Sequence, residues 1–374
     1  MRIVLFCHSL ISDWNHGNAH FLRGIATELQ RRGHTVRAFE PHDGWSLANL
    51  RAEGGEAAVR AFSEAYPGLS PSPVDLARLD LDEALDGADV VLVHEWNDHP
   101  LVARIGRHHA SGAGRHYALL FHDTHHRTVS DPAAMAAYDL QYYDGVLAFG
   151  EVIRERYARQ GWGRRAWTWH EAADVRVFHP LPAIPRTLDL VWIGNWGDDE
   201  RTAELHEFLI GPVKDLKLHA EVYGVRYPDD AIAALTEAGI RYRGWLPNYR
   251  VPEVLAASRL TLHIPRRPYV RELPGIPTIR PFEALACGTP LICSPWHDAE
   301  HLFTPGRDYV VARSGHDMKE LIRKVLTHAS FAEDLAVHGL STITERHTCA
   351  HRVDELLAIY GEMLAESRQL VATA

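Results

Sequence analysis

Arg280-Pro-Phe-Glu-Ala-Leu-Ala-Cys-Gly-Thr-Pro-Leu-Ile-Cys-Ser294 is the most informative segment of this chain. Its pattern predicts a helix that starts near Pro281 and ends at Gly288, followed by a buried strand over 291–293. Glu283 then falls in the first helical turn, where a carboxylate is compatible with the positive end of the helix dipole. The same helix end can receive a phosphate, and the carboxylate can accept hydrogen bonds from sugar hydroxyls. We therefore expect this helix end to form a binding site for a nucleotide diphosphate and its ribose.

A second interpretation of this segment stays open at this point. A helix, a glycine, a proline and a buried strand follow one another in many α/β folds. In that case Glu283 would be only a charge on the surface of an ordinary helix. The surrounding sequence has to decide between the two interpretations.

Length, charge and cysteine content exclude several classes of protein. A chain of 374 residues suggests two domains at roughly 150 residues each. The net charge of −10, from 39 basic and 49 acidic residues, gives no basic surface for nucleic acid or an anionic membrane. The four cysteines form no CxxC pair, which disfavours a structural zinc site or a secreted disulfide framework. No apolar run is long enough for a membrane span or a signal peptide, so we expect a cytoplasmic protein.

Apolar runs alternate with helical stretches along the whole chain, which favours parallel sheets covered by helices. The strand-like runs are residues 3–7, 35–39, 90–94, 118–122 and 146–149, and then 188–193, 218–223, 240–243, 260–264 and 291–293. A proline-rich segment over 179–185 separates the two series. The sequence thus predicts an α/β fold of two Rossmann-like domains in tandem, facing across a cleft at the carboxyl ends of their strands.

Five segments, taken in this order, resemble GT-B glycosyltransferases of the family-4-like type (glycosyl transferases group 1) and the related CgeB-like group. They are residues 17–20 with 29–34, 174–180, 243–247 with 252–258, 280–294 and 300–306. The resemblance implies an acceptor-side domain over 1–180, a nucleotide-sugar donor domain over 186–345, and a C-terminal helix over 346–374 that packs on the first domain. A plain C-terminal helix packed on its own domain is the alternative.

The resemblance also implies an activity. It is the metal-independent, retaining transfer of a sugar from a nucleotide-diphosphate sugar to a small-molecule, glycan or lipid-linked acceptor, with no cofactor. Dehydrogenase chemistry is disfavoured because no G-x-G-x-x-G pattern follows the first strand.

Two polar loops of the first domain supply candidates for sugar contacts. The loop after the first strand offers exposed N–H groups and hydrogen-bonding side chains, and its acceptor-side candidates are His16, Gly17, Asn18 and His20. The position of His122 in the sequence resembles that of a loop histidine that contacts the donor sugar in the family-4-like enzymes. We therefore expect His122 to position the transferred sugar, with Asp123 as its orienter or as a base.

The histidines around His122 also permit a zinc interpretation. His125 and His126 are adjacent, however, and cannot easily face one site from regular backbone. The resemblance implies chemistry without a metal, so we expect no metal site. A solvated polar loop without a catalytic role is the remaining alternative.

The second domain carries the candidates for the nucleotide. Asn195 stands where the resembled family has an arginine, and Arg201 stands near the place of its lysine. Arginines close to the donor helix are expected to replace the lost cation. The full set for the diphosphate and ribose is Asn195, Arg201, Arg266, Arg267, Arg280 and Glu283. The candidates for the nucleotide side are Tyr223, Arg243, Gly244 and Trp245.

One departure from the resembled family concerns the transferred sugar. The family carries two glutamates eight positions apart, and 283 − 8 gives Gly275. Glu272 is eleven positions from Glu283 (283 − 272), in a loop interrupted by proline and glycine. We expect backbone N–H groups of the loop Gly275, Ile276, Pro277 and Thr278 to face the sugar instead. The departure leaves two alternatives: a GT-B-like protein that binds sugar nucleotides without turnover, and a sugar-nucleotide epimerase.

Overall fold

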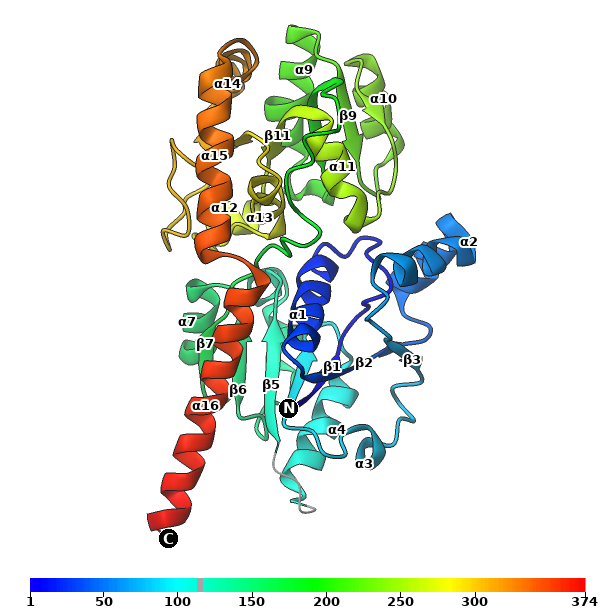
Figure 1. Cartoon of the computed structure of the whole chain (residues 1–374), viewed down its shortest axis with the longest axis vertical. Helices are drawn as coiled ribbons and strands as arrows, with labels where there is room; N and C mark the ends of the chain where they lie inside the picture. The colour runs from blue at the N-terminus through cyan, green and yellow to red at the C-terminus, as the bar shows by residue number, and fades with distance from the viewer. Residues whose placement is uncertain (113–116, 374) are drawn as a thin grey trace. The chain divides into compact units, whose positions relative to one another are not determined.

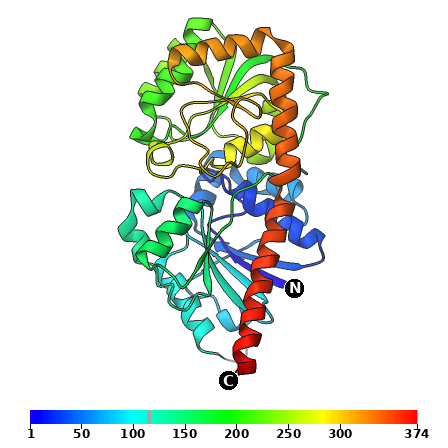
Figure 2. The same ribbon diagram turned by 90° about the vertical axis from the view of Figure 1, so that its left-hand side faces the viewer.

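The chain folds into two units in the computed structural model, which describes residues 1–112 and 117–373 (Figures 1 and 2). Unit 1 holds Met1–His170 together with the last segment of the chain, which starts at Cys349. Unit 2 is Glu171–Thr348. The proline-rich segment 179–185 therefore lies inside unit 2, and the first crossing between the units comes at Glu171, ahead of it.

Unit 1 contains a seven-stranded sheet in the order β3-β2-β1-β4-β5-β6-β7, and every neighbouring pair is parallel. Its strands are β1 Arg2–Phe6, β2 Thr35–Pro41, β3 Ser72–Val74, β4 Val90–His94, β5 Ala118–Asp123, β6 Gly145–Ala148 and β7 Ala166–Thr168. The order reverses between β1 and β4, and the carboxyl ends of strands at such a point are where open α/β sheets bind ligands.

Helices connect these strands. They are α1 Ala19–Arg31, α2 Trp45–Ala65, α3 Leu81–Ala84, α4 His99–Ala110, α5 Arg127–Ser130, α6 Pro132–Ala136 and α7 Glu151–Gln160. The region 44–73, which is irregular in sequence, forms α2, and this helix bends at Gly55, where φ is 60°. Only glycine adopts this conformation without strain.

The last helix, α16 Cys349–Thr373, packs against α1 inside unit 1 (Figure 1). Nη2 of Arg32 donates a 3.0 Å hydrogen bond to the carbonyl of Ala350. Nε1 of Trp169, a side chain with no exposed surface, donates a 2.8 Å hydrogen bond to the carbonyl of Arg352. The helix thus belongs to the first unit by its contacts, although it follows the second unit in the chain.

Unit 2 contains a six-stranded parallel sheet in the order β10-β9-β8-β11-β12-β13. Its strands are β8 Leu188–Ile193, β9 Ala220–Tyr223, β10 Arg241–Tyr242, β11 Ser258–His263, β12 Leu291–Cys293 and β13 Val310–Val311. The two parallel sheets agree with the expectation of two Rossmann-like domains, and β8 and β12 have the bounds expected from the sequence.

The helices of unit 2 include several short segments. They are η1 Asp198–Glu200, α8 Thr202–Leu205, η2 His206–Ile210, α9 Gly211–Leu216, α10 Asp229–Glu237, η3 Asn248–Arg250, α11 Val251–Ala256, α12 Arg267–Arg271, α13 Ile279–Ala286, α14 Gly315–Thr327 and α15 Ala329–Arg346. The sequence pattern predicts one helix over 199–209, whereas the chain forms the 3-10 turn η1, then α8 and then the π-helical η2. π-Helical segments are frequent near functional sites.

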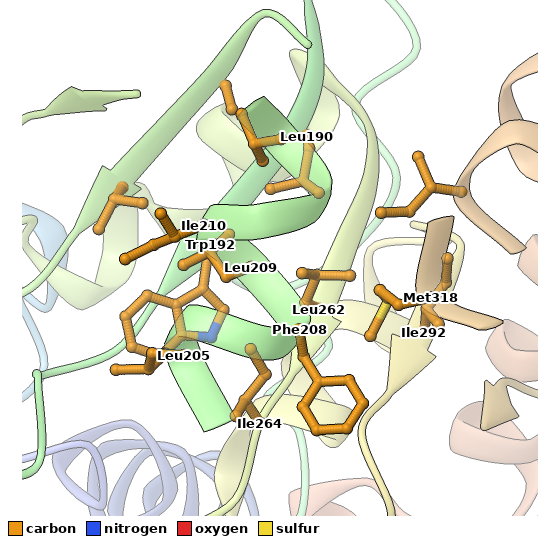
Figure 3. Packing of buried hydrophobic residues seen from close by; sticks show 14 of the residues in the cluster. Leu190, Trp192, Leu205, Phe208, Leu209, Ile210, Leu262, Ile264, Ile292 and Met318 are labelled. Carbon is orange, nitrogen blue, oxygen red and sulfur yellow. The ribbon is translucent and has the colours of Figure 1, made fainter. Parts of the chain in front are cut away.

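A core of buried apolar side chains fixes the strands of unit 2. Figure 3 shows Trp192 of β8 and Leu262 of β11 packed with Phe208 of η2 and Met318 of α14. Burying a large apolar side chain completely contributes about 1.5–3 kcal/mol. The core therefore holds the carboxyl ends of β8 and β11 rigidly, and these two ends carry the residues of the site described next.

Candidate active site

Helix α13 begins with strained backbone. Thr278, the residue before the helix, has φ 58° and ψ 179°, a region that is essentially restricted to glycine and costs about 1–3 kcal/mol for other residues. Such strain concentrates at functional sites. The helix ends before Gly288, which has φ +61°, as the sequence predicts.

Glu283 is buried on α13 and lies just after the first turn of the helix, two positions further along it than the sequence suggested. The helix starts at Ile279, two residues before Pro281, so its first turn contains no acidic residue. Glu283 is 1% exposed, and the interpretation of this residue as a surface charge is therefore wrong. A buried carboxylate needs partners, because an unpaired charge in the interior is costly.

Two side chains hold the Glu283 carboxylate. Nδ2 of Asn248 donates a 2.9 Å hydrogen bond to its Oε1, and Nη1 of Arg280 pairs with its Oε2. The carboxylate also lines a small pocket, together with Ile193, Val251, Leu255, Thr261, Leu262, Arg280 and Ala284. Asn248 was missed from the sequence, although it directly follows the segment 243–247 that carries the resemblance.

Arg201 is the cation of this region that has no carboxylate partner among the described residues. Its guanidinium donates to three carbonyls: those of Asn195, Trp196 (3.3 Å) and Ile264 (3.0 Å). It also lies over the ring of Trp192, 5.1 Å from the ring centroid. Surrounding protein, followed by the positive charge of Arg266, lowers the pKa of Arg201 to about 9, so the group is still mostly protonated at pH 7.

The other arginines are already neutralised. Nη1 of Arg266 lies 2.7 Å from Oε2 of Glu200, and Arg267 donates two hydrogen bonds to Glu204. Arg280 pairs with Glu283, as described above. The sequence places Arg201 near the lysine of the resembled family and offers the other arginines as replacements for the lost cation. The structure separates the two groups differently, because acidic residues of η1 and α8 pair with Arg266 and Arg267.

Asn195 has a structural task in the loop after β8. Its Oδ1 accepts a 3.0 Å hydrogen bond from the N–H of Val225, and its carbonyl accepts from Arg201. The side chain thus ties this loop to the loop after β9 instead of replacing the arginine of the resembled family. Asn195 positions Arg201 through its backbone.

His263 is a further polar residue of this region that the sequence did not single out. It ends β11, is 3% exposed, and neither of its ring nitrogens forms a hydrogen bond with another described residue. Burial, together with the nearby charge of Arg201, lowers the pKa of His263 to about 3, so the ring is neutral. A histidine at the carboxyl end of a strand, where open α/β sheets bind ligands, was the signal that could have identified it.

The loop before α13 only partly meets its expected role. The N–H of Gly275 donates to the carbonyl of His297 (2.9 Å), and Pro277 has no N–H, so neither can offer an N–H group to a sugar. The carbonyl of Ile276 accepts from Trp296 (3.0 Å). Within the described part of the chain the N–H groups of Ile276 and Thr278 form no hydrogen bond. These two N–H groups therefore remain available for the expected contact with the transferred sugar.

Glu300 fills the space beside Gly275. A Cβ atom built on Gly275 would lie 2.9 Å from Cγ and 3.1 Å from Oε1 of Glu300. The position where the resembled family has a glutamate therefore has a carboxylate next to it, supplied by a residue from a distant part of the sequence. Nothing in the local sequence pattern around Gly275 indicates this.

The residues expected on the nucleotide side lie together around Glu221. The hydroxyl of Tyr223 donates to Oε2 of Glu221 (2.7 Å), and Nε of Arg243 lies 3.5 Å from its Oε1. The carbonyl of Gly244 accepts from the N–H of Gly224 (2.8 Å), which joins the two loops, and Trp245 follows with a partly exposed side chain.

In unit 1, His122 and Asp123 point to opposite faces of β5, because successive residues of a strand alternate. His122 is 1% exposed and packs on Trp169, with ring centroids 4.9 Å apart. Oδ1 of Asp123 instead accepts from the N–H of His125 (3.2 Å). The expectation that Asp123 orients His122 is therefore wrong. Burial lowers the pKa of His122 to about 3 and raises the pKa of Asp123.

The expected acceptor-side loop is mostly buried. His16 is 6% exposed and His20, inside α1, has no exposed surface, whereas Gly17 and Asn18 remain partly exposed. The depth of His20 excludes it from direct contact with an acceptor in this structure. No group of three or more His, Cys, Asp or Glu side chains within residues 1–112 and 117–373 could hold a metal ion.

Comparison with known proteins gives one sequence match. Residues 201–358 match the family Glyco_trans_1_2, described as glycosyl transferase-like. No curated protein is significantly similar to the chain in sequence.

Among the described residues, no helix is both long enough and apolar enough to cross a membrane.

Solved structures give many more matches. Sucrose-phosphate synthase from Thermosynechococcus elongatus has a TM-score of 0.63 at 14% identity, with all of both chains covered. Anabaena Alr3699/HepE in complex with UDP-glucose has a TM-score of 0.67 at 14% identity, covering 98% of this chain and 100% of the other. An alpha-glucosyltransferase in complex with UDP and a 13-mer DNA has a TM-score of 0.68 at 12% identity, covering 96% and 99%. These similarities establish the GT-B fold.

Proposed function

We propose that this chain, whose residues 201–358 match a glycosyl transferase-like family and whose fold is GT-B, transfers a sugar from a nucleotide-diphosphate sugar to an acceptor. The observation that carries the proposal is Arg201, a guanidinium at the carboxyl ends of β8 and β11 whose hydrogen bonds within the described part of the chain all go to carbonyls.

An anion is the partner that completes the Arg201 site. A cation held away from water is stabilised by a charged partner more than by carbonyl dipoles alone. The charge of Arg280, at the first turn of α13, acts on Arg201, and the first N–H groups of a helix also attract anions. A diphosphate satisfies all of these groups.

Glu283 binds the ribose in this proposal. Asn248 and Arg280 fix its carboxylate, so the orientation is set before the ligand arrives. A carboxylate accepts hydrogen bonds from two neighbouring hydroxyls, which is the chemistry that a ribose offers. Two of the similar structures contain UDP or UDP-glucose, and we therefore propose uridine as the base to test first.

The chemistry proposed is metal-independent. When the bond between the sugar and the diphosphate breaks, negative charge grows on the leaving phosphate, and the fixed guanidinium of Arg201 and the N–H groups of α13 stabilise it. Glu300, beside Gly275, is the carboxylate proposed to bind hydroxyls of the transferred sugar. We propose retention of configuration at the transferred carbon, in line with the resembled family.

A thermal-shift screen tests this assignment. UDP, GDP, ADP, CMP and dTDP, each with a matching sugar nucleotide, are added to the purified full-length chain, since a ligand that binds only the folded state raises its melting temperature. We expect one nucleotide diphosphate to stabilise the wild type and not Arg201→Ala. Arg267→Ala, which removes an arginine already paired with Glu204, is the matched control and should keep the shift. Failure of every nucleotide to stabilise the wild type would overturn the assignment.

The product of the stabilising sugar nucleotide then separates the alternatives. Release of the nucleoside diphosphate with transfer of the sugar supports the proposal. An unchanged sugar nucleotide indicates a binding protein, and an epimerised one without any acceptor indicates an epimerase. The replacement of the expected glutamate by Gly275 is the observation that keeps the binding protein as the second candidate.

A further inference from the structure

Trp96 is an exposed indole held in a fixed orientation. It lies two residues after β4, at the carboxyl edge of the unit 1 sheet, and 41% of its surface is exposed. The guanidinium of Arg127 lies 5.1 Å from its ring centroid, and the ring of His125 packs against it at 5.1 Å with an interplanar angle of 70°. An exposed tryptophan is not unusual, but most are not packed between two side chains in this way.

A row of imidazole rings leads from Trp96 into the protein. His8, which follows β1, lies 6.2 Å from Trp96 between ring centroids. His16 lies 5.2 Å from His8, and His94, the last residue of β4, lies 6.0 Å from His16. The row therefore occupies the carboxyl ends of β1 and β4, where the strand order of this sheet reverses. Open α/β sheets bind ligands at this position.

Several ring nitrogens of this row have no partner within the described residues. Nε2 of His16 and Nδ1 of His94 are buried and form no hydrogen bond, and His8 forms none with either nitrogen. Nε2 of His94 is used, because it bonds to the hydroxyl of Thr124 at 2.9 Å. Buried polar groups in proteins are nearly always hydrogen-bonded, so a purely structural role leaves these nitrogens unexplained.

The chemistry of the row selects an uncharged ligand. Burial lowers the pKa of His8 to about 4 and the pKa values of His16 and His94 well below the ordinary value, so the rings are neutral at pH 7. A neutral imidazole offers one N–H donor and one acceptor, which suits hydroxyl groups better than phosphates. A metal ion does not fit, since no group of ligands among the described residues could hold one.

We propose that Trp96 packs against the ring face of an uncharged pyranose whose hydroxyl groups bond to His8, the partly exposed ring at the outer end of the row. The polarised C–H groups on one face of such a ring meet the negative face of the indole, and the hydroxyls at its rim meet the imidazole. The inference rests on the proposed function, because it identifies the acceptor of the transfer as a sugar or glycoside.

Saturation-transfer difference NMR tests the proposal on the full-length chain. The probes are methyl glycosides of glucose, galactose, mannose and N-acetylglucosamine, measured with and without UDP, and uridine alone as a flat aromatic competitor. We expect transfer to the ring protons of at least one glycoside with wild type, reduced about fivefold or more by Trp96→Ala. Trp45→Ala is the matched control, since Trp45 is also exposed (47%) in unit 1 but packs on Trp14 with no imidazole beside it.

A second variant separates the hydroxyl contacts from the indole contact. His8→Ala removes a partly exposed ring that forms no hydrogen bond with the described residues, so it should weaken the glycoside signal with little change in melting temperature. The proposal is overturned if no glycoside shows transfer in either condition, if Trp96→Ala binds like wild type, or if only uridine binds and depends on Trp96. These measurements need no turnover, so their failure is distinct from failure of nucleotide binding at Arg201.

Discussion

Asn248 and Glu283 are joined by a 2.9 Å hydrogen bond from Nδ2 to Oε1, although 35 positions separate them in the chain. Both side chains are buried, at 3% and 1% exposure. Asn248 enters from the 3-10 turn η3, and Glu283 from α13. The proposed ribose carboxylate is therefore oriented by a residue from another element of the same unit.

Asn248→Ala should weaken donor binding while leaving the chemical step less affected. Without the amide, the Glu283 carboxylate loses its hydrogen bond from Asn248, and a hydrogen bond to a charged group is worth about 1.5–3 kcal/mol. We expect the KM for the nucleotide sugar to rise about tenfold or more, as measured by steady-state kinetics. Glu253→Ala, an exposed residue of the neighbouring α11, should leave KM unchanged. Equal KM values for Asn248→Ala and wild type would contradict the role of Asn248.

Arg201→Ala should reduce kcat/KM by about 10²–10³, because the charge that grows on the leaving diphosphate would lose its fixed cation. Arg266→Ala removes an arginine that is paired with Glu200, and we expect a smaller loss of kcat/KM.

Addition of EDTA should leave the wild-type rate unchanged if the reaction needs no metal. Loss of activity in EDTA, restored by a divalent ion, would reject metal independence.

Gly275→Ala should destabilise the protein and impair transfer together. Its φ of +93° strains any residue with a Cβ, and the new atom would lie 2.9 Å from Cγ of Glu300. Gly239→Ala is the matched control: its φ is +75°, and nothing lies within 4 Å of the added atom. We expect a loss of about 1 kcal/mol for Gly239→Ala and a clearly larger one for Gly275→Ala, measured by urea denaturation.

Activity of the folded Gly275→Ala variant then tests Glu300. If Glu300 binds the transferred sugar, its displacement should lower kcat while Gly239→Ala keeps the wild-type rate. A Gly275→Ala protein that is folded and fully active would exclude this role for Glu300.

Asp13→Ala should be among the most destabilising changes in unit 1. Asp13 pairs at 2.8 Å with Arg23, whose side chain has no exposed surface, and removing one partner of a buried ion pair is strongly destabilising. We expect a loss of about 3–5 kcal/mol in the free energy of unfolding. Glu237→Ala breaks an exposed ion pair with Lys214 and should change stability by less than about 1 kcal/mol.

Buried histidines should make the protein less stable in mild acid. The pKa of His122 is lowered from the ordinary 6.5 to about 3, so between these values the unfolded chain binds a proton that the folded chain does not. Stability is then complete above pH 6.5 and falls as the pH drops below it. Between pH 7.5 and 5.0 this residue alone accounts for a loss of about 2 kcal/mol.

His122→Phe, which keeps a ring beside Trp169, should reduce the pH dependence by that amount. The measurement is the free energy of unfolding in urea at the two pH values. His316→Ala removes an exposed histidine and should leave the difference between them as in wild type. An unchanged pH dependence in His122→Phe would show that the His122 ring binds protons equally well in the folded and the unfolded chain.

Local patterns were sufficient for the secondary structure that depends on short-range periodicity. The apolar runs predicted β4, β8 and β12 with their observed bounds, since a strand buried on both faces reads as an uninterrupted apolar run. They failed at 199–209, where one helix was expected and three short segments formed. The start of α13 was also misplaced by two residues, because proline is favoured in a first turn without fixing which position it takes.

The candidate site was only partly predictable. The sequence identified Glu283, Arg201 and the loop before α13, because motifs and helix ends are local features. It did not identify His263 or Asn248, since burial beside another element leaves no mark on neighbouring residues. It also could not show that Arg266, Arg267 and Arg280 pair with carboxylates from η1, α8 and α13.

The sequence by itself determined the alternation of strands and helices, the two parallel sheets and the presence of a helix suited to bind a diphosphate. Periodicity and helix-end chemistry are properties of residues close together in the chain, and they can be interpreted there. Only the tertiary structure decided which cation lacks a carboxylate, that Asp123 turns away from His122, and that Glu300 stands beside Gly275. The physical reason is that charge pairing and burial depend on distances between residues far apart in sequence, and folding alone sets those distances.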